Sequence, residues 1–258
     1  MMIIDADCHI SSHKWDGLAI TAPGLIEEMD RAGVDRALVW AKPPYEKNIE
    51  PENQAVYEAV RRYPDRLIGF GWANPRLGAK RARAAIQRCF EDYGLAGIKF
   101  NGAQDDYVID DMAILPFIEQ AASYAKPLAF HIGADFYENT HPYRLGCIAG
   151  QFPEVPFLMV HMGGAGTPAL DRSAIEVAYA HPNITLVGSA IDERAILGAI
   201  TALGPGRLCF GSDTPFGLMH VQLAKYNALL RDHDQAARDL ILGGNMARLV
   251  GLAEGVRS

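Results

Sequence analysis

Residues 3–10 read IIDADCHI, and this stretch decides how the rest of the chain is interpreted. It has the apolar character of a buried strand, yet it carries two aspartates and a histidine at alternate positions. Because side chains alternate between the two faces of a strand, we expect Asp5, Asp7 and His9 to point the same way. Burial of such a set is unfavourable unless a cation or a hydrogen-bond network compensates the charges. The stretch therefore predicts a buried strand that leads into a polar site.

Similar apolar runs recur along the whole chain, and segments with helical spacing lie between them. Strand followed by helix, repeated, implies parallel strands joined by crossover helices. The further strand-like runs are RALVWAK (36–42), LIGFGWANP (67–75), GIKFNGA (97–103), LAFHIG (128–133), FLMVHMGG (157–164), ITLVGSA (184–190) and LCFGSDTPF (208–216). The helical segments are 24–33, 51–64, 79–94, 112–126, 141–153, 170–182, 194–204 and 219–232, and 235–252 reads as one or two closing helices.

The length of the chain fits this pattern. A (β/α)8 barrel typically needs about 250 residues, and the chain has 258. No GxGxxG or GxxxxGK[ST] motif follows the first strand, which argues against the commonest nucleotide-binding sheets. We therefore expect an α/β fold in which residues 1–258 form a single (β/α)8 TIM barrel.

Composition narrows the range of partners. The net charge is −7 and no Lys/Arg-rich run is present, so neither a nucleic acid nor an anionic membrane is an expected partner. No segment is apolar enough to span a membrane, and the first residues lack the features of a signal peptide. The four cysteines are scattered without a CxxC pair. These features predict a cytoplasmic protein that acts on a small molecule.

Polar residues gather at one end of the predicted strands. Active sites of such barrels lie at the carboxyl ends of the strands. The residues that occupy this end of their runs are His9, Lys99, His131, His161 and Asp213. The histidines offer imidazole nitrogen and Asp7 and Asp213 offer carboxylate oxygen, a mixture that suits one divalent ion. Zinc is the first expectation, with manganese or iron(II) as alternatives, whereas Asp5 is expected to support the site rather than to bind the metal.

Other polar residues on the same face are candidates for substrate binding. Lys99 has three interpretations: a salt-bridged barrel lysine, an anchor for a substrate carboxylate, or a carboxylated lysine that bridges metals. His13 and Arg144 lie in predicted loops on this face and could contact the substrate.

At these residues the chain resembles the amidohydrolase superfamily, and within it the branch that includes aminocarboxymuconate-semialdehyde decarboxylase and related decarboxylases, hydratases and hydrolases. The matching pieces are IIDADCH, ENQAVYEAVRRYPDRLIGFGWANP, GLAGIKFNG, PLAFHIG, FLMVHMGG, RLCFGSDTPFG and GGNMARLVGL. The resemblance implies a TIM barrel of the metallo-dependent hydrolase type with one metal ion, usually zinc. Its ligands would be Asp7, His9, His131 and Asp213, and His161 would orient water or polarise the substrate.

One position departs from that pattern. The family usually has His-x-His on the first strand, whereas this chain has Asp7-Cys8-His9. Aspartate adds negative charge, which is expected to shift the preference of the site toward manganese or iron or to weaken metal binding.

The primary hypothesis is a metal-dependent hydrolase that acts on a lactone, an ester or an amide. Asp213 would accept a proton from the attacking water, and His161 would polarise the carbonyl. The alternative is a non-oxidative, metal-dependent decarboxylase of an aromatic or muconate-like acid, in which Lys99, Lys42 or Arg144 would hold the carboxylate. A second alternative is a barrel that binds a ligand without catalysis. Pairing into a homodimer through helix faces is one alternative for the assembly.

Overall fold

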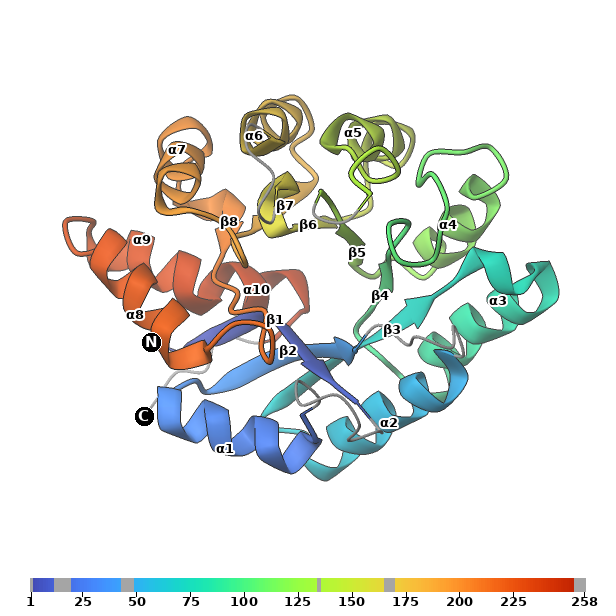
Figure 1. The fold of residues 1–258 in the computed structure, drawn as a ribbon, viewed down its shortest axis with the longest axis horizontal. Helices are drawn as coiled ribbons and strands as arrows, with labels where there is room; N and C mark the ends of the chain where they lie inside the picture. Colours follow the sequence, from blue (N-terminus) through green and yellow to red (C-terminus); the bar gives the residue numbers. More distant parts are fainter. Residues whose placement is uncertain (1, 12–19, 43–48, 134–135, 165–169, 253–258) are drawn as a thin grey trace.

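The computed structural model describes residues 2–11, 20–42, 49–133, 136–164 and 170–252. Its eight strands pair in parallel and in sequence order, which confirms the expected barrel (Figure 1). The strands are β1 (Ile4–Ile10), β2 (Arg36–Ala41), β3 (Leu67–Ala73), β4 (Gly97–Phe100), β5 (Leu128–His131), β6 (Phe157–Val160), β7 (Ile184–Val187) and β8 (Leu208–Cys209).

Most of the helices lie around the outside of the strands, as Figure 1 shows. They are α1 (Ala22–Ala32), α2 (Ile49–Arg62), α3 (Ala79–Gln87), α4 (Leu115–Ala122), α5 (Pro142–Gln151), α6 (Leu170–Ala180), α7 (Glu193–Leu203), α8 (Met219–Leu229), α9 (Gln235–Asp239) and α10 (Asn245–Leu249). The helix expected over 112–126 is shorter at both ends, and a π-helical turn over Arg88–Asp92 extends α3. No described helix is long and apolar enough to cross a membrane.

Backbone hydrogen bonds close the barrel between β1 and the segment after β8. The amide of Ala6 donates to the carbonyl of Phe210 at 2.9 Å, and the amide of Asp213 donates to the carbonyl of Asp7 at 2.9 Å. Strand β8 itself ends at Cys209, so the expected strand over 208–216 is too long. Asp213 therefore lies in the loop beyond β8, with a left-handed φ of 60°. We call this closure, residues 5–9 against 210–214, the seam.

Two apolar clusters fill the molecule. The outer cluster joins alternate strand residues to the helices, and Cys8 and Ile98 are members of it. The inner cluster consists mainly of the opposite strand residues, such as Trp40, Phe70 and Leu158. The inner cluster fills the barrel interior, so this fold leaves polar side chains at the carboxyl ends of the strands.

A bulge in β1 corrects the expected orientation of Asp5. The register of β1 on β2 shifts between Asp5 and Cys8. An extra residue in a strand reverses the faces on its two sides. Asp5 pairs with Ala37 and Cys8 follows on the same face, since both Ala37 and Cys8 belong to the outer cluster. The prediction that Asp5 points the same way as Asp7 and His9 is therefore wrong.

Asp5 instead stabilises the seam. One carboxylate oxygen, Oδ1, accepts hydrogen bonds from the amides of Asp7 at 3.1 Å and Ser212 at 2.9 Å. The other oxygen has no hydrogen-bond partner among the described residues. Burial raises the pKa of Asp5 to about 7, against the opposing effect of its hydrogen bonds with Ser212 and Asp7.

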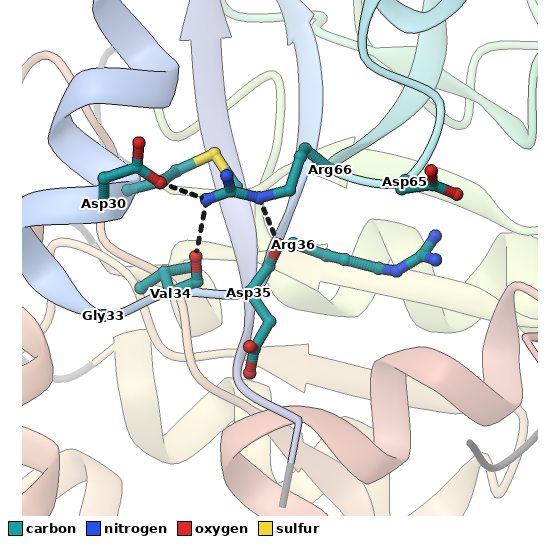
Figure 2. Close-up of a pocket in the computed structure, with 8 residues that line it drawn as sticks. Asp30, Gly33, Val34, Asp35, Arg36, Asp65 and Arg66 are labelled. Carbon is teal, nitrogen blue, oxygen red and sulfur yellow. Dashed lines mark hydrogen bonds and ion pairs between the residues drawn. The ribbon is translucent and has the colours of Figure 1, made fainter. Parts of the chain in front are cut away.

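A pocket at the amino ends of the strands is held together by Arg66. Its guanidinium donates to Asp30 at 2.8 Å and to the backbone carbonyls of Val34 at 3.2 Å and Asp35 at 2.8 Å (Figure 2). These bonds tie the turn before β2 to the turn before β3. Because the pocket lies opposite the polar end of the barrel, we assign it to stability.

Replacing Asp5 changes how stability depends on pH. Between 3.8 and about 7 the folded protein keeps the proton of Asp5 while the unfolded chain releases it, so this residue makes the free energy of unfolding fall as pH rises. Asp5→Asn keeps the acceptor oxygen and removes the titration. We expect the difference in unfolding free energy between variant and wild type, measured with urea, to grow in favour of the variant across this window. A constant difference would contradict the assignment.

Replacing Arg66 lowers stability without touching the polar end of the barrel. Arg66→Ala removes charged hydrogen bonds to two carbonyls, and we expect the free energy of unfolding to fall by about 1–3 kcal/mol in urea titrations. Arg36→Ala is the matched control, because no hydrogen bond of the Arg36 guanidinium to a described residue is seen in the same pocket. Equal losses in both variants would contradict the role given to Arg66.

Candidate metal and active site

Three side chains converge at the seam. His9 Nε2 lies 3.4 Å from Asp7 Oδ1 and 3.3 Å from Asp213 Oδ1. Within the described ranges, these residues form a group whose ligand atoms all lie within 4.8 Å of one another. Asp7 and His9 come from β1 and Asp213 from the loop after β8, so the backbone bonds of the seam bring the three together.

The two distances from His9 Nε2 to the carboxylate oxygens are typical of ligands that share a divalent ion. Ligand atoms bound to zinc at about 2.0–2.1 Å in tetrahedral geometry lie roughly 3.3 Å apart. Asp7 Oδ1 is buried and has no hydrogen-bond partner among the described residues. Burial acts to raise the pKa of Asp7, but the adjacent His9 ring and the nearby Lys99 ammonium hold that pKa well below its usual range. An ionised, buried oxygen without a partner is what a cation would satisfy, so the residues fit one.

The ring of His9 is held in place on two sides. Its Nδ1 lies 3.2 Å from the carbonyl of Ala41, which directs the Nδ1 proton there and leaves Nε2 as the acceptor. The indole N–H of Trp40 donates to Nε2 at 3.1 Å. The ring of Phe216 meets His9 edge-on at a centroid distance of 5.3 Å and is 47% exposed. A bound cation would compete with Trp40 for the Nε2 lone pair.

His131, the fourth ligand implied by the family resemblance, ends β5 but is not a member of the three-residue group. Its Nε2 is buried and has no hydrogen-bond partner among the described residues. Burial and the neighbouring His161 lower the pKa of His131 well below its usual range, so the ring is neutral. A neutral, unpaired imidazole retains the lone pair that a metal needs.

His161 lies next to His131, with ring centroids 4.7 Å apart. It follows β6 directly and has a left-handed φ of 66°, a strained conformation that is typical of functional sites. Its Nδ1 lies 3.0 Å from Ser189 Oγ, which also donates to Asp7 Oδ2 at 2.5 Å. Ser189 was missed in the sequence, although it follows the run ITLV at the same strand end as the histidines.

Lys99 is fully buried below these groups. Its Nζ lies 3.7 Å from the centre of the Trp40 ring and has no hydrogen-bond partner among the described residues. Burial lowers the pKa of Lys99 to about 8, while Asp7 and Asp213 oppose that shift. At neutral pH the ammonium group therefore balances part of the carboxylate charge of the site.

The remaining candidates for substrate binding are Arg144, Lys42 and His13. The Arg144 guanidinium donates to Asp110 at 2.7 Å and to the carbonyl of Glu138 at 2.7 Å. Lys42 directly follows β2, and its backbone amide donates to Ile10. His13 lies outside the described residues. The role of each in substrate binding stays a prediction.

Comparison with known proteins identifies the family of this chain and several relatives. The model of the amidohydrolase family matches residues 4–252. The chain is 24% identical to the 2-amino-3-carboxymuconate-6-semialdehyde decarboxylase of Dictyostelium discoideum, over 94% of this chain and 79% of that protein.

Two solved structures share the fold. The 5-carboxyvanillate decarboxylase LigW of Sphingomonas paucimobilis has a TM-score of 0.77 at 18% identity, covering 98% of this chain and 99% of that one. A dihydroxybenzoic acid decarboxylase of a Polaromonas species, solved with manganese and the inhibitor 2-nitroresorcinol, has a TM-score of 0.77 at 18% identity, covering 100% and 99%.

These relatives overturn the hydrolase hypothesis. Each is named as a decarboxylase, which matches the alternative drawn from the sequence and not hydrolysis of a lactone, ester or amide. The error has a chemical reason: the same ligands and proton-carrying groups serve both reactions, because each needs an oxygen anion to be stabilised beside a proton donor. The family itself is shown by a match that spans the barrel from its first strand to its closing helix. The chain belongs to the amidohydrolase family.

Proposed function

We propose that this protein is a metal-dependent, non-oxidative decarboxylase of a small aromatic or muconate-like acid. The observation that carries the proposal is the unpaired Asp7 Oδ1 beside His9 Nε2 and Asp213 Oδ1, a buried cation site in a barrel whose named relatives are decarboxylases. In the reaction the bond between the carboxylate and the adjoining carbon breaks, carbon dioxide leaves, and that carbon takes a proton.

Asp7, His9 and Asp213 would hold the cation, with His131 as the fourth ligand. Two carboxylates and two imidazoles suit manganese, iron(II) or zinc, and a manganese-bound neighbour favours testing manganese alongside zinc. A bound cation supplies Lewis-acid stabilisation of a substrate oxygen anion.

The chain's own residues carry the remaining roles. Asp213 and His161 are the proposed proton-carrying groups, since both lie at the carboxyl ends of the strands beside the cation ligands. Lys99 holds positive charge close to where the substrate carboxylate would bind. Phe216, exposed beside His9, offers an apolar ring against which a planar acid can lie.

Removing the metal tests the proposal directly. We expect protein purified without chelator to release carbon dioxide from at least one of 2,6-dihydroxybenzoate, 5-carboxyvanillate and 2-amino-3-carboxymuconate semialdehyde. Chelation should abolish the release, and manganese or zinc should restore it. Turnover that survives complete metal removal would contradict a metal-dependent reaction, and the absence of carbon dioxide with every acid and metal would contradict decarboxylation of these acids.

Asp213→Asn removes one negative charge from the site and also removes a proposed proton-carrying group. We expect kcat to fall by about 10²- to 10⁴-fold while the far-ultraviolet circular dichroism is unchanged. The matched control is Asp232→Asn, the same change at a side chain that is 91% exposed, and it should keep full activity. Full turnover in a folded Asp213→Asn variant would exclude this residue from catalysis.

A further inference from the structure

Ser189 links Asp7 to His161, two side chains of the site that lie far apart in the sequence. It lies two residues beyond β7 and is fully buried. Its Oγ is 2.5 Å from Asp7 Oδ2 and 3.0 Å from His161 Nδ1, whereas the direct distance from His161 Nδ1 to Asp7 Oδ2 is 3.6 Å. The hydroxyl is therefore the hydrogen-bonded link between the two side chains.

The direction of these hydrogen bonds follows from the number of protons. A serine hydroxyl has one proton to donate and lone pairs to accept with. An ionised carboxylate only accepts, so the Ser189 proton goes to Asp7 Oδ2. The contact with His161 must then be donated by the ring, from Nδ1–H to Ser189 Oγ. His161 consequently carries its ring proton on Nδ1, and its Nε2 is the atom left to take or give a proton.

The same link orients Asp7. Its Oδ2 is engaged by Ser189, while Oδ1 is the oxygen without a partner that lies 3.4 Å from His9 Nε2. A carboxylate held by one oxygen presents the other to the cation, as is common for ligands supported by neighbouring hydrogen bonds. Ser189 thus determines which oxygen of Asp7 faces the metal.

The surrounding backbone is built to hold Ser189 in this place. Tyr226 donates from its hydroxyl to the carbonyl of the preceding Gly188 at 2.8 Å. Across the seam, a Cβ at Gly211 would lie 3.1 Å from Ser189 Cβ and 3.2 Å from Asp7 Cβ. Contacts that short are rare, so glycine at position 211 allows Ser189 and Asp7 to approach the same point.

We propose that Ser189 is a positioning residue that fixes His161 as the Nδ1–H tautomer and directs Asp7 Oδ1 to the cation. The effect of Ser189 on the reaction rate rests on the proposed function. The effect of Ser189 on the tautomer of His161 does not depend on that function. The two can therefore be tested separately.

The tautomer is measured by two-dimensional ¹H–¹⁵N NMR of the zinc-loaded protein with ¹⁵N-labelled histidine, at mildly alkaline pH. The His161 signals are assigned by their loss in His161→Gln. We expect a protonated Nδ1 and an unprotonated Nε2 in the wild type, and a shift toward the Nε2–H tautomer in Ser189→Ala. A wild-type ring protonated on Nε2 would overturn the proposal, even if the Ser189→Ala protein failed to fold. An unchanged Nδ1–H signal in folded Ser189→Ala would also overturn it.

Thr185→Val is the matched control, because it removes a buried hydroxyl from the same β7 strand. No hydrogen bond joins Thr185 to the site residues in the described part of the chain. Both the His161 signals and the activity of this variant should match the wild type.

Kinetics separate positioning from a structural role. With the acid that the wild type decarboxylates best, Ser189→Ala should retain about one metal ion per chain under saturating zinc, lose about 10- to 100-fold in kcat, and change KM little. The pH profile of kcat should also shift, since the proton-carrying ring has changed its tautomer. An unchanged kcat and pH profile would contradict the catalytic consequence. If the wild type decarboxylates no acid, the proposed function fails while the NMR result still decides the role of Ser189.

Discussion

The structure depends on the seam where β1 meets the segment after β8. Three short backbone hydrogen bonds there, from Ala6, His9 and Asp213, close the ring of strands. The same bonds place Asp7 and His9 of the first strand beside Asp213 of the last loop. The bonds that close the barrel therefore also assemble the candidate cation site, and a residue more than 200 positions along the chain becomes a neighbour of His9.

Charge compensation is the second constraint on this region. Asp7 and Asp213 lie close together with His9, and burial alone would favour protonating such acids. Lys99 lies beneath them against Trp40, and its positive charge helps to keep Asp7 ionised. Asp5, on the opposite face of the same strand, has no such cation beside it among the described residues, and burial raises its pKa to about 7. The pKa values of two aspartates that are two residues apart therefore shift in opposite directions, because a bulge turns the side chains toward different surroundings.

The barrel could be predicted from the sequence because apolar strand runs and helical segments alternate in it without interruption. The strand-end rule also selected His9, His131, His161 and Asp213 as candidates, since these ionisable residues stand out in apolar runs. The register of β1 could not be predicted, because no residue in IIDADCHI signals the bulge that turns Asp5 away from Asp7 and His9. Ser189 was not predicted as a site residue, because serine is common in turns. Its contacts with Asp7 and His161 form only when strands that are distant in the sequence lie close together.

The chemistry of the reaction was less accessible than the fold. The same donors serve hydrolysis and decarboxylation, so residue types at strand ends do not separate the two, and it was the named relatives that overturned the hydrolase interpretation. Substrate contacts depend on loops, and the Arg144 that the sequence offered as a substrate group pairs with Asp110.

We propose that Asp7, His9 and Asp213 hold one divalent ion at the seam. Anomalous diffraction from crystals soaked in manganese can locate that ion. We expect a single strong manganese peak in contact with Asp7 Oδ1, His9 Nε2 and Asp213 Oδ1. No peak between these atoms at saturating manganese, or a peak bound by other residues, would contradict it.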